Sequence, residues 1–95
     1  MLDYLQKHIM EELKGAIDYM TKAIEHKGKP CGQKFYSMAM MELDHANSLV
    51  KMFSGEDRPK GLSDAEYSEL YRTILDAYST HMGKIEAMKK LYWSE

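Results

Sequence analysis

The chain has 95 residues, with 13 basic and 15 acidic side chains and a formal net charge of −2. This balance excludes a bulk electrostatic attraction to nucleic acid or to an anionic membrane. The single cysteine, Cys31, excludes an internal disulfide and a cysteine-rich zinc site within one chain. No apolar run approaches the roughly 18 residues of a membrane span, and residues 1–14 lack the layout of a signal peptide. We therefore expect a cytoplasmic protein without a membrane or nucleic-acid partner.

The composition favours helices over strands. Valine, isoleucine and threonine, which fill the faces of β-sheets, number nine in all. Methionine, glutamate, lysine, alanine and leucine dominate instead, and these residues are good helix formers. We predict an all-α fold and a single domain over 1–95. A core of this size is marginal, so we also expect an oligomer that buries further surface.

Residues that break helices cluster in two short stretches of the chain. Four of the six glycines and both prolines lie in 28–32 and 55–61, and clusters of this kind end helices. The pattern predicts three helices, over residues 2–27, 33–54 and 63–93. Short connections make sequence neighbours antiparallel, so the first two helices should form a hairpin.

The first predicted helix has one apolar stripe with an acidic residue beside it. The stripe consists of Leu2, Leu5, Ile9, Leu13, Ala16, Met20, Ala23 and Ile24. Glu12 lies about 65° from the centre of this stripe when residues are placed at helical intervals. His8 precedes Glu12 by one turn.

The second predicted helix carries charged groups within its apolar arc. The arc consists of Phe35, Met38, Ala39, Ala46, Leu49 and Phe53. Glu42 falls at about the middle of this arc, and His45 lies inside its edge. An unpaired carboxylate in a core costs several kcal/mol, so Glu42 needs a partner, a proton or a metal. Four methionines of this helix are expected to serve mainly as adaptable core: Met38, Met40, Met41 and Met52.

The long third helix should begin at a capping box formed by Ser63 and Glu66. Gly83 within it is expected to mark a kink or a close approach. Its apolar stripe consists of Tyr67, Tyr71, Ile74, Tyr78, Ile85, Met88 and Tyr92. This helix contains no Glu-x-x-His sequence.

Folding the hairpin brings Glu12 level with Glu42 and His45. A carboxylate and an imidazole three residues apart share a helical face and can ligate one ion. Ferritin-like di-iron proteins use an isolated Glu from each of two helices and a Glu-x-x-His from each of two others. The three residues make half of that set, so two copies of the chain would complete a four-helix bundle around a di-metal site.

These residues also resemble a known family, the short half-ferritins. The resemblance covers roughly residues 5–53, and it is carried by the run Glu11-Glu12-Leu13, Ala16, Asp18-Tyr19 and Glu42-Leu43-Asp44-His45-Ala46. The most similar pattern is that of the encapsulated ferritin-like family, with a hairpin like that of rubrerythrins. The resemblance implies a ferroxidase that dimerises around a di-iron centre. It also implies assembly of dimers into a ring, packaged inside an encapsulin shell where oxidised iron is mineralised.

The family pattern carries over residue by residue. Glu12 resembles its bridging carboxylate, while Glu42 and His45 resemble its second-helix ligands. Tyr19 matches an aromatic residue beside the metal site, and Glu11 matches one acid of the site through which iron enters. The chain departs from the pattern at Lys14, which stands where the second acid of that site is expected. Its third helix is far longer than the family's final helix, and its last six residues do not resemble an encapsulin-targeting tail.

Each candidate residue also has an ordinary structural interpretation. Glu42 and His45 can form a buried ion pair, and Glu12 can pair with a lysine on the helix flank. Tyr19 can be a boundary residue that needs one hydrogen bond. His8 and His81 are further candidate ligands, although isolated helical histidines are usually packed or lie at a rim. We assign no chemistry to Cys31, which is expected in a turn.

Two classes of function follow from the sequence. In the first, the protein is a ferroxidase that oxidises Fe(II) with O₂ or peroxide, with iron as the expected metal and manganese as an alternative. A rubrerythrin-like peroxide reductase belongs to the same class, although the chain has no cysteine-rich iron site for electron transfer. In the second, the protein is a non-enzymatic helical assembly or adaptor protein with a structural Glu/His pair, whose third helix binds a partner.

Overall fold

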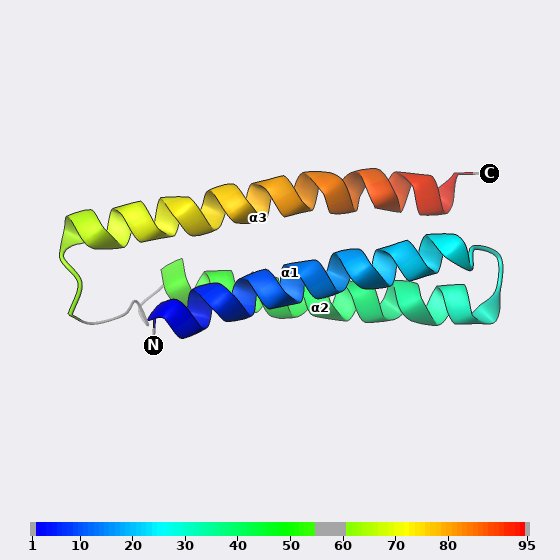
Figure 1. Cartoon of the computed structure of the whole chain (residues 1–95), viewed down its shortest axis with the longest axis horizontal. Helices are drawn as coiled ribbons and strands as arrows, with labels where there is room; N and C mark the ends of the chain where they lie inside the picture. The colour runs from blue at the N-terminus through cyan, green and yellow to red at the C-terminus, as the bar shows by residue number, and fades with distance from the viewer. Residues whose placement is uncertain (1, 55–60, 95) are drawn as a thin grey trace.

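The computed structural model describes residues 2–54 and 61–94, with the side chains of residues 2, 3 and 54 left aside. Its described residues form three helices, α1 (Leu2–Glu25), α2 (Pro30–Ser54) and α3 (Asp64–Trp93), and no strand. The predicted all-α class is therefore confirmed. Most of the second predicted break, residues 55–60, lies outside the described residues, as does the side chain of Leu2. Figure 1 shows α1 and α2 side by side and antiparallel, with α3 lying along them.

The turn between α1 and α2 covers residues 26–29 and not the predicted 28–32, because α1 ends at Glu25, before the predicted residue 27, and α2 begins at Pro30. Pro30 does not extend the break but begins α2, because its fixed φ and missing N–H suit the first helical position. Cys31 is consequently an exposed residue of the first helical turn, and its expected place in the turn was wrong. Gly28 adopts a φ of +85° that favours glycine. A Cβ at Gly32 would collide with the carbonyl oxygen of His26, so this glycine lets the start of α2 lie close against the turn.

The third helix begins as predicted. The Ser63 hydroxyl accepts a hydrogen bond from the Glu66 amide at 3.1 Å, and the Ser63 amide donates to the Glu66 carboxylate at 3.2 Å. This reciprocal capping box satisfies two amides at the start of α3. Gly83 makes no close approach, because a Cβ there would meet nothing within 4 Å.

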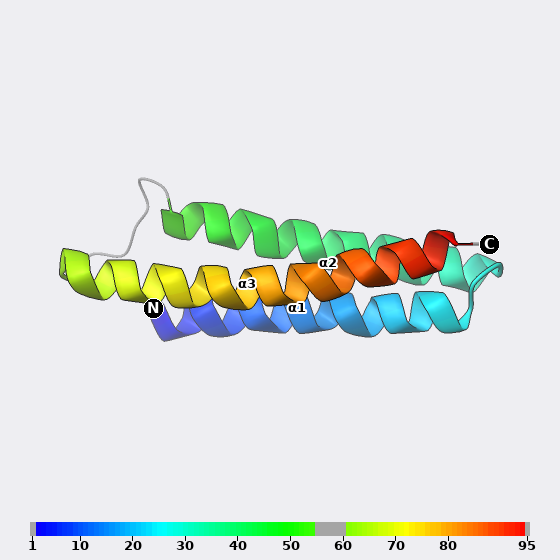
Figure 2. The same cartoon turned by 90° about the horizontal axis from the view of Figure 1, so that it is seen from above.

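The core lies where the three helices meet. Figure 2 shows α3 running lengthwise over the hairpin, and α3 packs chiefly against α1. The predicted stripes of α1 and α3 both contribute buried side chains. The buried residues are Ile9, Leu13, Ala16, Met20 and Ala23 of α1, Ala39, Leu43, Ala46 and Phe53 of α2, and Ile74, Ile85 and Tyr92 of α3. The result is a bundle of 50 × 18 × 18 Å.

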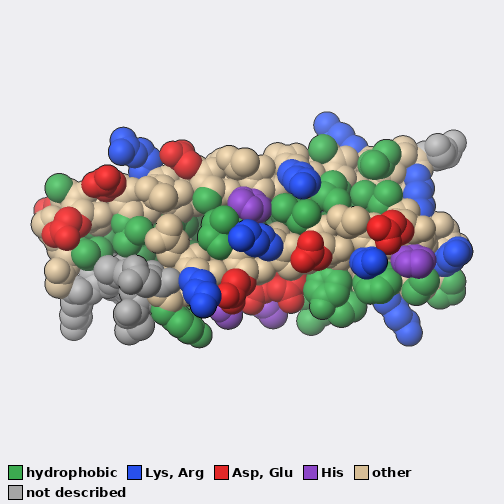
Figure 3. Space-filling model, in the orientation of Figure 1, with side chains coloured by type: hydrophobic (Ala, Val, Ile, Leu, Met, Phe, Trp, Pro, Cys, Tyr) green, Lys and Arg blue, Asp and Glu red, His purple; other side chains and the backbone are tan. Residues whose placement is uncertain are grey.

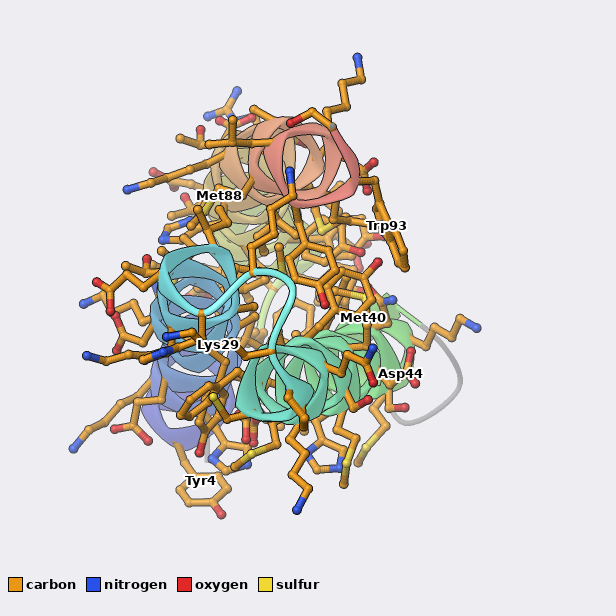
Figure 4. All side chains as sticks on the ribbon, turned by 90° about the vertical axis from the view of Figure 1, so that its right-hand side faces the viewer. Tyr4, Lys29, Met40, Asp44, Met88 and Trp93 are labelled. Atoms are coloured by element: carbon orange, nitrogen blue, oxygen red, sulfur yellow. The ribbon has the colours of Figure 1, made fainter. Side chains whose placement is uncertain are left out.

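The far end of α3 is attached to the hairpin by several contacts. The Lys27 ammonium donates to the Leu91 carbonyl at 3.1 Å and to the Ser94 carbonyl. Tyr36 stacks on Tyr92 with ring centroids 4.7 Å apart. These contacts hold α3 on one side of the hairpin and leave the opposite side uncovered (Figure 4).

Among the helices that the structure describes, none has the length and hydropathy needed to cross a membrane.

Candidate metal centre

Glu12, Glu42 and His45 lie together, as the folding of the hairpin predicted. Glu12 comes from α1, and the other two residues come from α2. One potential ligand atom from each residue lies within 4.8 Å of the others. Carboxylate oxygens and an imidazole nitrogen at these separations are a donor set suited to a divalent transition metal.

Glu42 and His45 of α2 are less buried than the sequence predicted. Leu43, and not Glu42, occupies the buried arc of α2, and Glu42 lies half-buried beside it. The reason is that α2 packs against both α1 and α3, so its buried arc turns toward the groove between them. His45 is correspondingly exposed, with 58% of its side chain accessible. The expected core role of Met38, Met41 and Met52 was wrong for the same reason, since all three are exposed.

The Glu12 carboxylate is at the centre of the cluster. Its side chain is 13% exposed, and its two oxygens face two different imidazoles. Oε1 lies 3.4 Å from Nε2 of His8, and Oε2 lies 3.5 Å from Nδ1 of His45. Oε2 is buried and has no hydrogen-bond partner within the described part of the chain. A buried carboxylate oxygen without a donor is costly, so it favours a proton or a cation nearby.

The pKa of Glu42 is shifted by the neighbouring Glu12 carboxylate. A hydrogen bond between the Glu42 and Glu12 side chains raises the pKa of Glu42 above its ordinary value, and burial and the Glu12 charge raise that pKa further. The positive charges of His45 and His8 oppose this shift. The hydrogen bond requires a proton on one of the two carboxyl groups. When both groups are ionised, a metal ion can take the place of that proton.

The cluster opens on the side of the hairpin remote from α3. Tyr4, which stacks on His8 with ring centroids 5.6 Å apart, projects from this side in Figure 4, whereas Met88 and Trp93 lie beside α3. In Figure 3, acidic and histidine side chains gather along the lower edge, away from α3. We call this surface the open face, and its exposed or half-buried residues are Tyr4, His8, Glu12, Met38, Met41, Glu42, His45 and Met52.

The remaining predicted residues have different surroundings. His8 joins the cluster through Glu12. Tyr19 is half-buried and stacks on Phe35 with centroids 6.3 Å apart. Glu11 is exposed, and its carboxylate lies 4.0 Å from the Lys7 ammonium. His81 belongs to α3, where its Nδ1 lies 2.7 Å from the Ala77 carbonyl oxygen of the same helix.

Sequence reasoning missed one residue that contacts the cluster, Gly15. A Cβ at this position would lie 3.1 Å from Oε2 of Glu42. The sequence did contain an indication of this contact, since glycine is unfavourable inside a helix and is retained there mainly for packing or function. Of the two glycines outside the breaks, Gly83 was expected to mark a kink or a close approach, but its surroundings are open.

The donor set can hold a cation but does not complete its coordination. Glu12, Glu42 and His45 supply three donor side chains, and His8 offers a fourth donor beside Glu12. In ferritin-like di-iron and di-manganese carboxylate proteins, the metal ligands come from four helices. Comparison with models of protein families, with curated proteins and with solved structures finds no match for this chain.

Proposed function

We propose that the protein is a ferroxidase whose di-metal site forms between two copies of the chain. The observation that carries this proposal is the convergence of Glu12, Glu42 and His45 within 4.8 Å, with one buried Glu12 oxygen lacking a hydrogen-bond partner among the described residues. Each chain supplies a carboxylate and a Glu-x-x-His pair, which is half of the ferritin-like ligand set. A symmetric pair of chains would therefore supply six ligands for two ions.

The open face supports a second copy as the partner that completes the site. Large apolar side chains are exposed beside the ligands, including Tyr4, Met38, Met41 and Met52. Each ligand-bearing helix could pack against its counterpart, which makes a four-helix bundle from two hairpins. In this arrangement α3 stays on the outside of each hairpin. Assembly beyond the dimer and packaging in an encapsulin shell are further proposals that rest on the family resemblance.

The proposed reaction uses iron as the substrate. Each Fe(II) loses one electron, so two ions together reduce O₂, which takes up two protons to become H₂O₂, and two Fe(III) are left. Glu12 is the natural bridge between the ions, because its two oxygens point in different directions toward two imidazoles. Glu42 and His45 would bind one ion in each half. Carboxylate and imidazole ligands accommodate both oxidation states of iron, and manganese is the alternative metal.

A titration with Fe(II) under anaerobic conditions tests this function. We expect about two ions per dimer, loss of binding in Glu12→Gln, and normal binding in the control Glu25→Gln, an exposed acid of the same helix. Admission of O₂ should then oxidise the bound iron faster than iron in buffer. If peroxide oxidises it and O₂ does not, the activity is that of a rubrerythrin-like peroxide reductase.

A structural role for the cluster is the competing proposal, and the contacts of Glu12 with His8 and His45 favour it. In that case the protein is a helical assembly or adaptor protein. It would bind neither Fe(II) nor Mn(II) with useful affinity, and Glu12→Gln would lower stability without changing metal content. The same titration separates the two proposals.

A further inference from the structure

Gly15 is the point at which α1 approaches the Glu42 carboxylate. A Cβ at this position would lie 3.1 Å from Oε2 of Glu42, 3.5 Å from its carboxyl carbon and 3.7 Å from its Cγ. The first distance is shorter than the 3.4 Å at which ordinary van der Waals contact begins. Glu42 therefore extends from α2 across the open face and lies directly on the backbone of α1.

The glycine is not explained by the conformation of the helix. Gly15 lies inside α1 and is absent from the glycines with positive φ, so alanine could adopt its backbone angles and would favour the helix. Gly83 provides the contrast, because it also lies inside a helix and a Cβ there would meet nothing within 4 Å. The distinguishing feature of Gly15 is thus the carboxylate that occupies the space of a side chain.

We propose that Gly15 is a positioning residue that places the Glu42 carboxylate beside Glu12 for metal binding. This inference rests on the proposed metal-binding function. A methyl group at residue 15 would push Oε2 of Glu42 away by a few tenths of an ångström. Metal sites are recognised by metal–ligand distances within about 0.2 Å of their usual values, so a displacement of Glu42 by more than this should weaken metal binding. The Glu42 side chain is flexible enough to move, and the fold would therefore survive the substitution.

The experiment compares Gly15→Ala with the matched control Gly83→Ala. The affinity of each protein for Mn(II) is measured by titration, with helix content recorded by circular dichroism. We expect both variants to fold and Gly83→Ala to bind like the wild type. Gly15→Ala should bind about 10-fold more weakly or worse, which is the loss typical of residues that orient ligands. Unchanged affinity in a folded Gly15→Ala variant would overturn the proposal.

A second measurement examines the contact without metal. Gly15→Ala and Gly83→Ala are each introduced into the wild type and into a Glu42→Ala background, and the melting temperatures of the apo proteins are compared. If Gly15 acts through Glu42, alanine at residue 15 should raise the melting temperature more in the Glu42→Ala background than in the wild type. Alanine at residue 83 should have the same effect in both. Equal effects of Gly15→Ala in both backgrounds would contradict the proposed contact.

The two measurements also separate this inference from the proposed function. A wild type that binds neither Mn(II) nor Fe(II) would refute the metal site and with it the positioning role. A wild type that binds metal, beside a Gly15→Ala variant that binds equally well, would refute the role of Gly15 and leave the metal site intact.

Discussion

His45 Nδ1 lies 3.5 Å from Glu12 Oε2, although the two residues belong to different helices of the hairpin. The other oxygen of Glu12 faces His8, which is one turn away on its own helix. Glu12 is therefore the side chain that joins the ligand candidates of α1 to those of α2.

Replacing Glu42 with alanine should separate metal binding from structural support. In the apo protein Glu42 shares a confined site with Glu12, so Glu42→Ala should leave stability unchanged or raise it. In the wild type, metal at 100 times its Kd should add about 2.7 kcal/mol, and the variant should lose this gain. Thermal melts with and without Mn(II) measure both effects. The control is Glu86→Ala, an exposed acid of α3.

A different outcome for Glu42→Ala would support the structural alternative. If the carboxylate mainly supports its neighbours, the variant should lose about 1 kcal/mol or more in both conditions. The wild type would then show no response to metal. That combination would remove the basis for a ferroxidase.

The stability of the apo protein should depend on pH through Glu42. Its pKa is raised by the hydrogen bond with Glu12, by burial and by the Glu12 charge, so the native state holds this proton more tightly than the unfolded chain. Stability therefore falls as pH rises from the ordinary value of 4.5 through the raised pKa. Denaturant melts across this range should show a smaller fall in Glu42→Gln. Identical pH slopes for the two proteins would contradict the assignment.

Metal binding should have the opposite pH dependence. Metal must displace the proton from Glu42, and histidine must be neutral to act as a ligand. The affinity for Mn(II) should therefore decrease as pH falls from 7 toward 5. Isothermal titrations in buffers of different ionisation enthalpy would detect the released protons. An affinity independent of pH over this range would argue against both ligands.

His8 should influence the site through Glu12. Its Nε2 lies 3.4 Å from Oε1 of Glu12, and its ring is held by stacking on Tyr4. His8→Ala should weaken metal binding by about 10-fold because Glu12 loses a partner that orients it. Lys7→Ala is the control, since Lys7 pairs with the exposed Glu11. Equal affinities of the two variants would limit His8 to a packing role.

The open face should mediate dimer formation. Met41 lies four residues before His45 on α2 and is 58% exposed. Met41→Lys would place a charge against the second copy and should shift the protein to monomers in analytical ultracentrifugation. Leu91→Lys is the matched control, because Leu91 is 56% exposed and lies on α3. A strictly monomeric wild type at high concentration with metal present would defeat the shared site.

Much of the secondary structure could be predicted from the sequence, because the residue preferences that specify it act over a few residues. The poverty of β-branched residues favoured helices, and the capping box of Ser63 and Glu66 defined where α3 begins. The spacing of Glu12, Glu42 and His45 along two helices was enough to predict that they meet, because a short turn leaves little freedom in the register of a hairpin.

Tertiary structure decided which side of α2 is buried. Helical periodicity placed Glu42 at the centre of an apolar arc, but that arc included Met38, which is exposed, and omitted Leu43, which is buried. The arc turned because α3 packs on one side of the hairpin, and no local pattern in α2 encodes the position of a third helix. The same packing exposed His45 and left the candidate ligands on an open face. The role of Gly15 arose in the same way, since the space that a glycine leaves is defined by the side chain that another helix brings to it.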